Sequence, residues 1–301
     1  MYNLNYCNEI LKKISEDENY SRLKDYSKEN HKVKTYFEIG KLLYEAGKHY
    51  GENIIGQYSI IIQKEKGKKY NERTLRRYRQ FYLRFYNIKW SQAATELSWS
   101  HYSELISIGD DIKLKYYINQ CIKLKLSRNE LRNKIKMQEY ERLSEYAKHK
   151  LANEENITIQ DFIKNPILIK SQNKLNSITE KDLQNIILED IPTFLEELGN
   201  NFSFIKNEYK IKIGDRYNYI DLLLYNIEYN CYVVIELKVT ELKKEYIGQI
   251  ETYMNYIDTN LKTINQDKTI GIIICKKDNQ FIMEYCSDPR ILSREYLIKN
   301  Y

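Results

Sequence analysis

The sequence predicts a two-domain α+β protein, with an all-helical first half and a second half of mixed strands and helices. Apolar residues recur at helical spacing through much of residues 1–150, whereas residues 202–275 contain apolar runs of strand length separated by polar turns. The charge divides in the same way. Residues 1–150 hold 30 Lys and Arg against 19 Asp and Glu, a balance of +11, and residues 151–301 hold 18 against 23, a balance of −5.

The first half contains four segments in which apolar residues recur every three or four positions, as in helices that bury one face. Ser127 followed by Glu130 is a capping-box pair that favours a helix start. We therefore assign residues 1–150 to a helical, basic domain. The four segments are residues 33–46, 74–85, 112–123 and 127–137.

The most arginine-rich segment, residues 71–84, is the strongest candidate for nucleic-acid binding. A short helix with this density of cations can lie along phosphates while Leu75, Phe81 or Tyr82 anchors it to the core. The alternative is a solvated basic face that pairs with acids elsewhere in the chain. The predicted phosphate-binding residues are Arg73, Arg76, Arg77, Arg79 and Arg84.

The second half predicts the element order helix, three strands, helix, strand. A strand followed by a helix and another buried strand indicates a right-handed crossover within a sheet that helices cover. Pro192, inside the first helix, is expected to kink or break it. We assign residues 151–176 to a linker and residues 177–301 to the second domain. The elements are expected at residues 181–198, 202–213, 220–225, 231–238, 242–257 and 269–275.

Two carboxylates and an ammonium are predicted to meet on the strand hairpin. If Tyr225 pairs with Tyr232, the same register puts Asp221 directly across from Glu236, with Cβ atoms ~4.5–5.5 Å apart. Carboxylates at that distance repel one another unless a cation lies between them. Lys238 lies two residues past Glu236 and points to the same face. The pattern predicts a metal site with an adjacent ammonium.

A Glu-x-Lys triplet alone has little specificity, because the chain contains three of them, at residues 208–210, 236–238 and 241–243. The third is expected to open a helix, and the first lies on a strand with no Asp on a preceding strand to face it. Only the second combines a β-branched strand with an opposed Asp. Its alternative interpretation is a strand end with a surface ion pair, although burying Glu and Lys among apolar residues is costly without partners.

Several segments carry a resemblance to a known family, at residues 194–199, 219–223, 233–238, 245–249 with Tyr253, and 271–275. On these segments the chain resembles the PD-(D/E)XK nuclease superfamily, and more closely its YhcG-like family. Residues 73–82 and 97–102 are similar to the helical N-terminal domain of the same proteins. Ile220 stands where the superfamily name has Pro, and Lys244 where relatives often carry Pro, and neither change removes a metal ligand.

The resemblance implies a restriction-endonuclease-like αβββαβ domain and divalent-metal-dependent hydrolysis of DNA phosphodiester bonds. Asp221, Glu236 and the Leu237 carbonyl would hold Mg²⁺ or Mn²⁺, since oxygen ligands suit hard cations. The metal would activate a water and stabilise the charge that develops on the phosphate. Lys238 would position or deprotonate that water, or stabilise the phosphorane-like state.

The resemblance also implies two further site residues. An acid from the first helix is expected to join the site; Glu189 is the choice from its distance to the helix end, and Glu197 remains the alternative. Gln249 matches a family position near the metal, with a cap or a sheet-facing hydrogen bond as its other interpretation. Tyr253, one helical turn later, is expected to serve packing.

A second hypothesis is a catalytically silent DNA-binding or adaptor protein that keeps the nuclease-like fold. RNA as the partner, and a homo-oligomer, are left open. The five cysteines are scattered without a Cys-x-x-Cys pair, which indicates reduced thiols rather than a zinc cluster. The chain shows no cleavable signal and no apolar run near ~20 residues, so we expect a cytoplasmic protein that does not enter a membrane.

Overall fold

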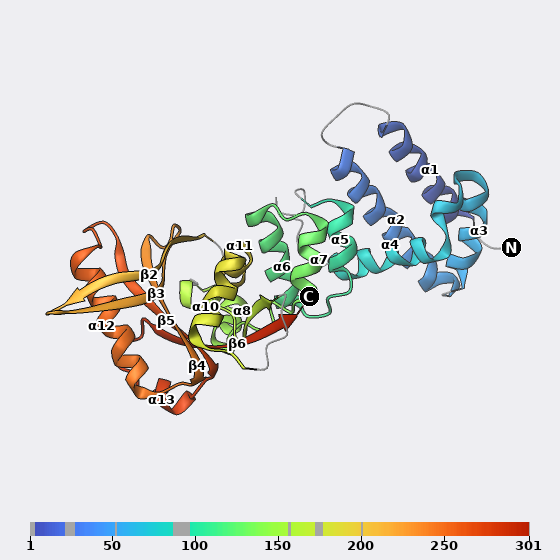
Figure 1. Cartoon of the computed structure of the whole chain (residues 1–301). Coiled ribbons are helices and arrows are strands. Elements are labelled where there is room, and N and C mark those ends of the chain that lie inside the picture. Colours follow the sequence, from blue (N-terminus) through green and yellow to red (C-terminus); the bar gives the residue numbers. More distant parts are fainter. Residues whose placement is uncertain are drawn as a thin grey trace. The chain divides into compact units, whose positions relative to one another are not determined.

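The computed structural model describes residues 4–21, 28–51, 53–86, 97–155, 158–171, 177–199 and 201–300. The chain forms two compact units, Met1–Gln138 and Glu139–Tyr301 (Figure 1). This division differs from the predicted boundaries, because the residues expected in a linker belong to the second unit. No helix within the described ranges is both long and apolar enough to cross a membrane.

Every regular element described in the first unit is a helix, as predicted. The predicted capping box is confirmed, since Glu130 Oε2 accepts a hydrogen bond from the Ser127 N–H at 2.6 Å. The helices are α1 (Asn5–Tyr20), α2 (Lys28–Tyr50), α3 (Ile54–Lys66), the 3₁₀ turn η1 (Lys68–Tyr70), α4 (Glu72–Phe85), α5 (Trp99–Leu105), α6 (Asp111–Leu124) and α7 (Arg128–Lys136).

The arginine-rich helix α4 packs closely against α2. A Cβ on Gly40 of α2 would lie 2.1 Å from the Tyr78 carbonyl oxygen, so only glycine fits at this crossing. Leu75 and Phe81 are fully buried and anchor α4 in the core, as predicted. The asparagine before the helix, Asn71, caps it by accepting a hydrogen bond from the Thr74 N–H at 3.0 Å.

The second unit contains a six-stranded sheet with helices on both faces. Its elements are α8 (Glu145–Ala152), α9 (Ile159–Phe162), β1 (Ile167–Ser171), α10 (Glu180–Glu189), α11 (Ile191–Leu198), β2 (Phe202–Ile213), β3 (Arg216–Asn226), β4 (Cys231–Glu241), α12 (Lys244–Asn260), β5 (Asp267–Lys277), α13 (Gln280–Glu284) and β6 (Ile291–Asn300). The strand order is β1-β6-β5-β4-β3-β2. β2, β3 and β4 are antiparallel neighbours, and the other neighbours are parallel. The predicted αβββαβ order is confirmed.

The helix expected over residues 181–198 is broken at Asp190, as Pro192 predicted. α10 ends at Glu189, and the Asp190 side chain caps α11 by accepting a hydrogen bond from the Thr193 N–H at 3.2 Å. Proline is tolerated in the first turn of a helix because its missing N–H has no helical partner there. The break therefore produces two short helices that cover one face of the sheet.

β1 lies at the edge of the sheet, where the sequence predicted a linker. It pairs in parallel with β6, and four of its five residues are buried. A strand that is buried on both faces shows no alternation of apolar and polar residues. Periodicity could not distinguish this five-residue run from an irregular segment.

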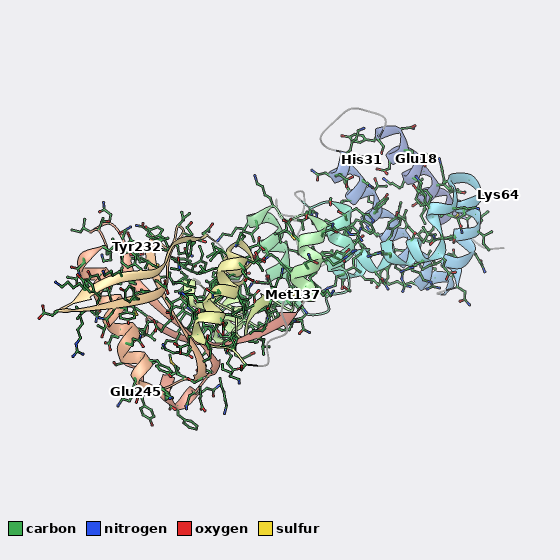
Figure 2. The ribbon with its side chains drawn as sticks, in the orientation of Figure 1. Glu18, His31, Lys64, Met137, Tyr232 and Glu245 are labelled. Carbon is green, nitrogen blue, oxygen red and sulfur yellow. The ribbon has the colours of Figure 1, made fainter. Side chains whose placement is uncertain are left out.

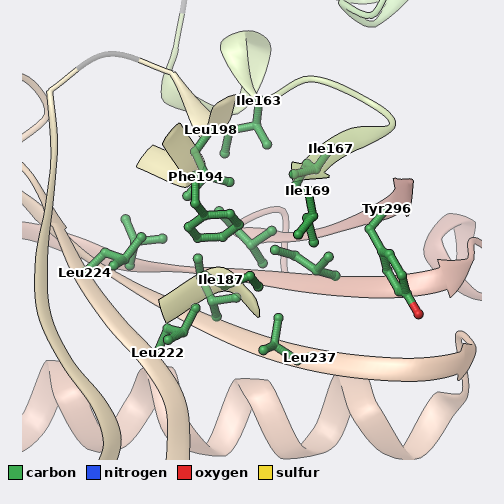
Figure 3. Packing of buried hydrophobic residues seen from close by; sticks show 14 of the residues in the cluster. Ile163, Ile167, Ile169, Ile187, Phe194, Leu198, Leu222, Leu224, Leu237 and Tyr296 are labelled. Atoms are coloured by element: carbon green, nitrogen blue, oxygen red, sulfur yellow. The ribbon is translucent and has the colours of Figure 1, made fainter. Parts of the chain in front are cut away.

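Two apolar layers enclose the sheet. On one face, β3 and β4 pack against α10 and α11, with Phe194 inside the layer (Figure 3). On the other face, Leu223 and Val234 pack against α12. α12 approaches β5 closely, because a Cβ on Gly271 would lie 2.5 Å from the Met254 sulfur. Since β4 is covered on both faces, a charged residue within it must find a specific partner.

Candidate active site

The hairpin of β3 and β4 has the predicted register. Tyr225 pairs with Tyr232, which is labelled in Figure 2, and their ring centroids lie 5.2 Å apart. Four residues further along the same register, Asp221 lies opposite Glu236, and the regular pairing of the two strands ends one position before them. Asp221 Oδ2 instead accepts a hydrogen bond from the Leu237 N–H at 2.8 Å.

Glu236 is a buried carboxylate whose two oxygens have different surroundings. The residue is 2% exposed. Its Oε1 accepts hydrogen bonds from Lys238 Nζ at 2.9 Å and from Gln249 Nε2 at 2.7 Å. Its Oε2 is buried and has no hydrogen-bond partner among the described residues. A buried carboxylate oxygen without a donor is costly, so this atom is suited to a cation or to a proton.

Lys238 is held beside Glu236 at 6% exposure. Besides its contact with Glu236, its Nζ lies 3.6 Å from Glu180 Oε2 and 5.0 Å from the centre of the Tyr246 ring. Two carboxylates and an aromatic face therefore surround one ammonium. This arrangement fixes the position of the charge far more tightly than a surface lysine would allow.

Burial is the main cause that favours the protonated forms of both carboxylic acids. Burial, and then the charge of Asp221, raises the pKa of Glu236 from 4.5 to about 7. Burial also raises the pKa of Asp221, although the Leu237 N–H and Lys238 oppose that change. Burial alone would lower the pKa of Lys238, but Glu236 and Glu180 outweigh it and the pKa is raised. The site therefore attracts positive charge at neutral pH.

The helix before the hairpin contributes a different acid from the one predicted. Glu180, in the first turn of α10, is the residue whose carboxylate approaches Lys238. Glu189 is exposed at the other end of α10, and nine residues at ~1.5 Å each separate the two by ~13 Å along the axis. Gln184, between them, donates a hydrogen bond from Nε2 to the Asp221 carbonyl at 3.0 Å. α10 thus presents its N-terminal part to the site.

The alternative acid, Glu197, is part of a separate buried ion cluster. It accepts hydrogen bonds from Arg142 and, at 3.1 Å, from the Leu168 N–H, and Lys164 Nζ lies 3.5 Å away. Lys164 also pairs with Glu139 at 3.3 Å. These contacts join Glu197 to residues 142–168 of the second unit, so its carboxylate stabilises the fold.

Glu208 of the first Glu-x-Lys triplet also lies near the site. On β2 it stands between the pairs Asn207–Leu222 and Tyr209–Ile220, which places it opposite Asp221. It forms an ion pair with Lys181 at 2.6 Å, and its charge contributes to the raised pKa of Asp221. This neighbour was not predicted, because a facing Asp was expected only on a strand that precedes the triplet.

The donor set around Asp221 and Glu236 is compatible with a hard cation, since it consists of oxygen atoms, one of them buried without a donor. Within the described ranges, no three His, Cys, Asp or Glu side chains converge on one point as ready-made metal ligands. The two carboxylates would therefore be completed by backbone oxygen, water or the substrate phosphate.

The predicted phosphate-binding helix forms one wall of a groove in the first unit. The groove has a volume of about 1010 Å³, and Arg73, Arg76, Arg77 and Arg84 line it together with Gln80, Leu83 and Ser103. Arg79 is not among the lining residues. α4 thus directs four of its five arginines to a single hollow.

Partners within the unit hold three of these arginines in place. Arg77 donates to the Ser103 carbonyl at 2.5 Å, and Arg84 donates to the Ile108 carbonyl at 2.6 Å and pairs with Asp111 at 2.5 Å. Arg76 pairs with Glu72 at 2.7 Å. The alternative of pairing with acids thus holds for Arg76 and Arg84, whereas the contact of Arg77 within the described ranges is with a neutral carbonyl.

Comparison with known proteins agrees with this organisation. Residues 5–142 match the DUF1016 N-terminal domain, and residues 160–300 match the YhcG PDDEXK nuclease domain. The chain is 23% identical over 285 residues to the protein of Escherichia coli (strain K12) named "Putative nuclease YhcG", a match that covers 80% of this chain and 76% of that protein.

Two solved structures are more distant. A repair endonuclease from Pyrococcus abyssi gives a TM-score of 0.30 at 18% identity, over 41% of this chain and 49% of the other. EndoMS in complex with double-stranded DNA gives 0.31 at 17% identity, over 42% and 48%. The matched region thus spans about half the length of either structure. On the two domain matches and the geometry of the hairpin, the chain belongs to the YhcG-like family of PD-(D/E)XK nucleases.

Proposed function

We propose that this protein is a divalent-metal-dependent nuclease that hydrolyses phosphodiester bonds of DNA. One observation carries the proposal: Glu236 is buried in an apolar strand with Oε2 lacking a donor among the described residues, opposite Asp221 and next to Lys238. A strand that served only the fold would gain stability from an apolar residue at this position. The charged cluster is explained if it binds a cation and a phosphate.

Asp221, Glu236 and the Leu237 carbonyl would hold Mg²⁺ or Mn²⁺. When bound, the ion would lower the pKa of a water molecule and stabilise negative charge on the phosphate. Glu236 is oriented for this task by the 2.7 Å hydrogen bond from Gln249, which α12 holds against the sheet. Gln249 is thus a positioning residue in this proposal.

Lys238 would act on the phosphate or on the attacking water. Its Nζ is held between Glu236 Oε1 and Glu180 Oε2, so the ammonium stays at the edge of the carboxylate pair. A preorganised positive charge stabilises developing negative charge without having to reorganise during the reaction. Glu236, and after it Glu180, would outweigh the effect of burial on the pKa of Lys238 and keep it protonated, which favours electrostatic stabilisation over proton abstraction.

The groove beside α4 would bind the DNA backbone. Arg73 is exposed there, and Arg77 points its charge into the groove from a fixed carbonyl contact. Arginine suits phosphate binding because its planar head donates several hydrogen bonds and stays charged. DNA is therefore the proposed partner of both units.

The test is incubation of the purified full-length protein with supercoiled, linear, branched and single-stranded DNA, with and without Mg²⁺ or Mn²⁺. Cleavage that requires the ion and is lost in EDTA would support the proposal. Binding without cleavage of any of these DNAs would favour the silent DNA-binding or adaptor protein instead.

A further inference from the structure

The hairpin of β2 and β3 carries an exposed row of alternating lysines and tyrosines. Lys210 pairs with Tyr219 and Lys212 pairs with Tyr217, so the four side chains share one face of the hairpin. Tyr217 is 56% exposed and Tyr219 is 51% exposed. Figure 1 shows the turn of this hairpin at one end of the sheet of the second unit.

The opposite face of the same hairpin is buried. Ile211 and Ile220 belong to the apolar layer that includes α12. The hairpin is therefore held firmly by one face, and the exposed tyrosines are not needed to fill the core. Two neighbouring tyrosines that leave half of their surface in solvent require another explanation.

The charge of the hairpin is opposite to that of its domain. Residues 206–219 hold four Lys and Arg against two Asp and Glu, a balance of +2, whereas residues 151–301 as a whole have a balance of −5. Lys210 Nζ lies 3.8 Å from the centre of the Tyr217 ring. Cations interleaved with exposed aromatic rings form the kind of surface that binds single-stranded nucleic acid.

The row ends beside the candidate active site. Tyr219 is two residues before Asp221 on the same strand, a distance of ~7 Å at ~3.4 Å per residue. A nucleic-acid strand whose phosphate reached Asp221 would therefore have its next nucleotides within reach of the hairpin.

We propose that the face formed by Lys210, Lys212, Tyr217 and Tyr219 binds an unpaired nucleic-acid strand next to the phosphodiester bond that is cut. The lysines contact phosphates and the tyrosine rings stack on bases. Unpaired bases are required because a duplex covers the flat faces of its bases, leaving none for the rings. This inference rests on the proposed function and narrows its substrate to DNA with a single-stranded segment.

The test measures affinity of the full-length protein in EDTA, so that binding is read without cleavage. The probes are a fluorescent oligothymidylate of about 20 nucleotides and a hairpin duplex of similar length. Stacking is worth ~1–3 kcal/mol per base, so the loss of both rings in Tyr217→Ala with Tyr219→Ala should weaken single-strand binding by about 30-fold or more and leave the salt dependence unchanged. Lys210→Ala with Lys212→Ala should reduce the slope of log affinity against log salt by about 1.4.

Two controls separate stacking from general damage. Phe281 and Tyr285 are exposed on and just after α13 of the same unit, at 78% and 84%, and their replacement by Ala should leave binding unchanged. Replacement of Tyr217 and Tyr219 by Phe should also preserve affinity, because the rings remain.

The outcomes distinguish this inference from the proposed function. If the Tyr217 and Tyr219 alanine variant binds the single strand as tightly as the wild type while the wild type cleaves DNA with Mg²⁺, only the hairpin inference is overturned. If that variant loses single-strand affinity and the wild type cuts none of the DNAs, the binding face stands and the nuclease proposal fails.

Discussion

Positive charge is held in opposite ways in the two units. Along α4, Arg73 is exposed and Arg77 lines an open groove, so both cations are accessible to solvent. Each can therefore attract a polyanion independently of the other. In the sheet, Lys238 is 6% exposed and lies against Glu236. Exposed cations attract a polyanion in proportion to their number, whereas one buried ammonium acts on a single group at close range. In the proposed function, the exposed arginines of α4 therefore bind the DNA and the buried ammonium takes part in the reaction.

The largest effect is expected from the carboxylates. Asp221→Asn and Glu236→Gln each keep the shape of the side chain and remove a metal-binding charge, so either should abolish detectable cleavage while DNA affinity remains. Cleavage of supercoiled DNA and binding in EDTA would be measured side by side. Glu241→Gln, at an exposed position of the triplet at residues 241–243, is the matched control and should cut normally. Wild-type activity in Asp221→Asn would show that any cleavage arises elsewhere.

Lys238→Ala should slow cleavage on the order of 10²–10³-fold, as expected for one electrostatic group among several. Metal binding should remain, because the carboxylates are unchanged, and kcat should fall more than KM rises. Lys243→Ala serves as the control, since Lys243 is an exposed residue before α12. If Lys238→Ala changed DNA affinity and left kcat intact, the buried ammonium would be a binding group. Lys238 would then have the same role as the arginines of α4.

The arginines should affect affinity without affecting the chemical step. Arg73→Ala combined with Arg77→Ala should reduce the slope of log affinity for duplex DNA against log salt by about 1.8, at ~0.9 per phosphate contact. At saturating DNA, cleavage should be close to normal. Lys64→Ala, which removes an exposed cation of α3, is the control and should leave the slope unchanged. An unaltered slope in the double variant would place the DNA contact outside the groove.

The smallest effect concerns stability and pH. Because the folded-state pKa of Glu236 is raised from 4.5 to about 7, its protonated form favours folding. This contribution is complete below about pH 4.5 and is lost as the pH rises through about 7. In EDTA, the melting temperature should therefore fall between pH 6 and pH 8 more in the wild type than in Glu236→Gln.

Divalent metal should reverse that loss at pH 8. A ligand that binds only the folded state adds ~2.7 kcal/mol at a hundredfold excess over its Kd. Mn²⁺ should thus raise the melting temperature of the wild type and have little effect on Glu236→Gln. Identical responses of the two proteins to both pH and Mn²⁺ would contradict a carboxylate pair that binds the ion.

The register of the β3–β4 hairpin could be predicted from the sequence, because it depends on residues that lie close together in the chain. The polar turn of hairpin length led us to expect that Tyr225 pairs with Tyr232, which the structure confirms, and Asp221 and Glu236 lie one position beyond the last regular pair of that register. Gln249 lies on α12 at a position that reaches Glu236, as the family resemblance implied. The register depends on local strand pairing, which leaves a periodic signal, whereas the expectation for Gln249 came from the family resemblance.

What the sequence missed depends on packing between distant segments. Glu180 was overlooked in favour of Glu189 because periodicity gives the buried face of a helix and does not tell which end of α10 meets the hairpin. Glu197 belongs to an ion cluster with Arg142, and these two residues lie 55 positions apart in the chain, so no local pattern connects them. β1 left no alternating pattern.

The ion cluster around Glu197 determines where the chain can be truncated without destabilising the second unit. A nuclease fragment that began at residue 177 would lose Arg142, Lys164 and the β1 strand, and would leave Glu197 as an uncompensated charge in its interior. Breaking a buried ion pair in this way costs ~3–5 kcal/mol, a large part of the stability of a small domain. A recombinant fragment of the second unit should therefore start at Glu139, so that Glu197 keeps its salt-bridge partners and the sheet keeps its edge strand β1.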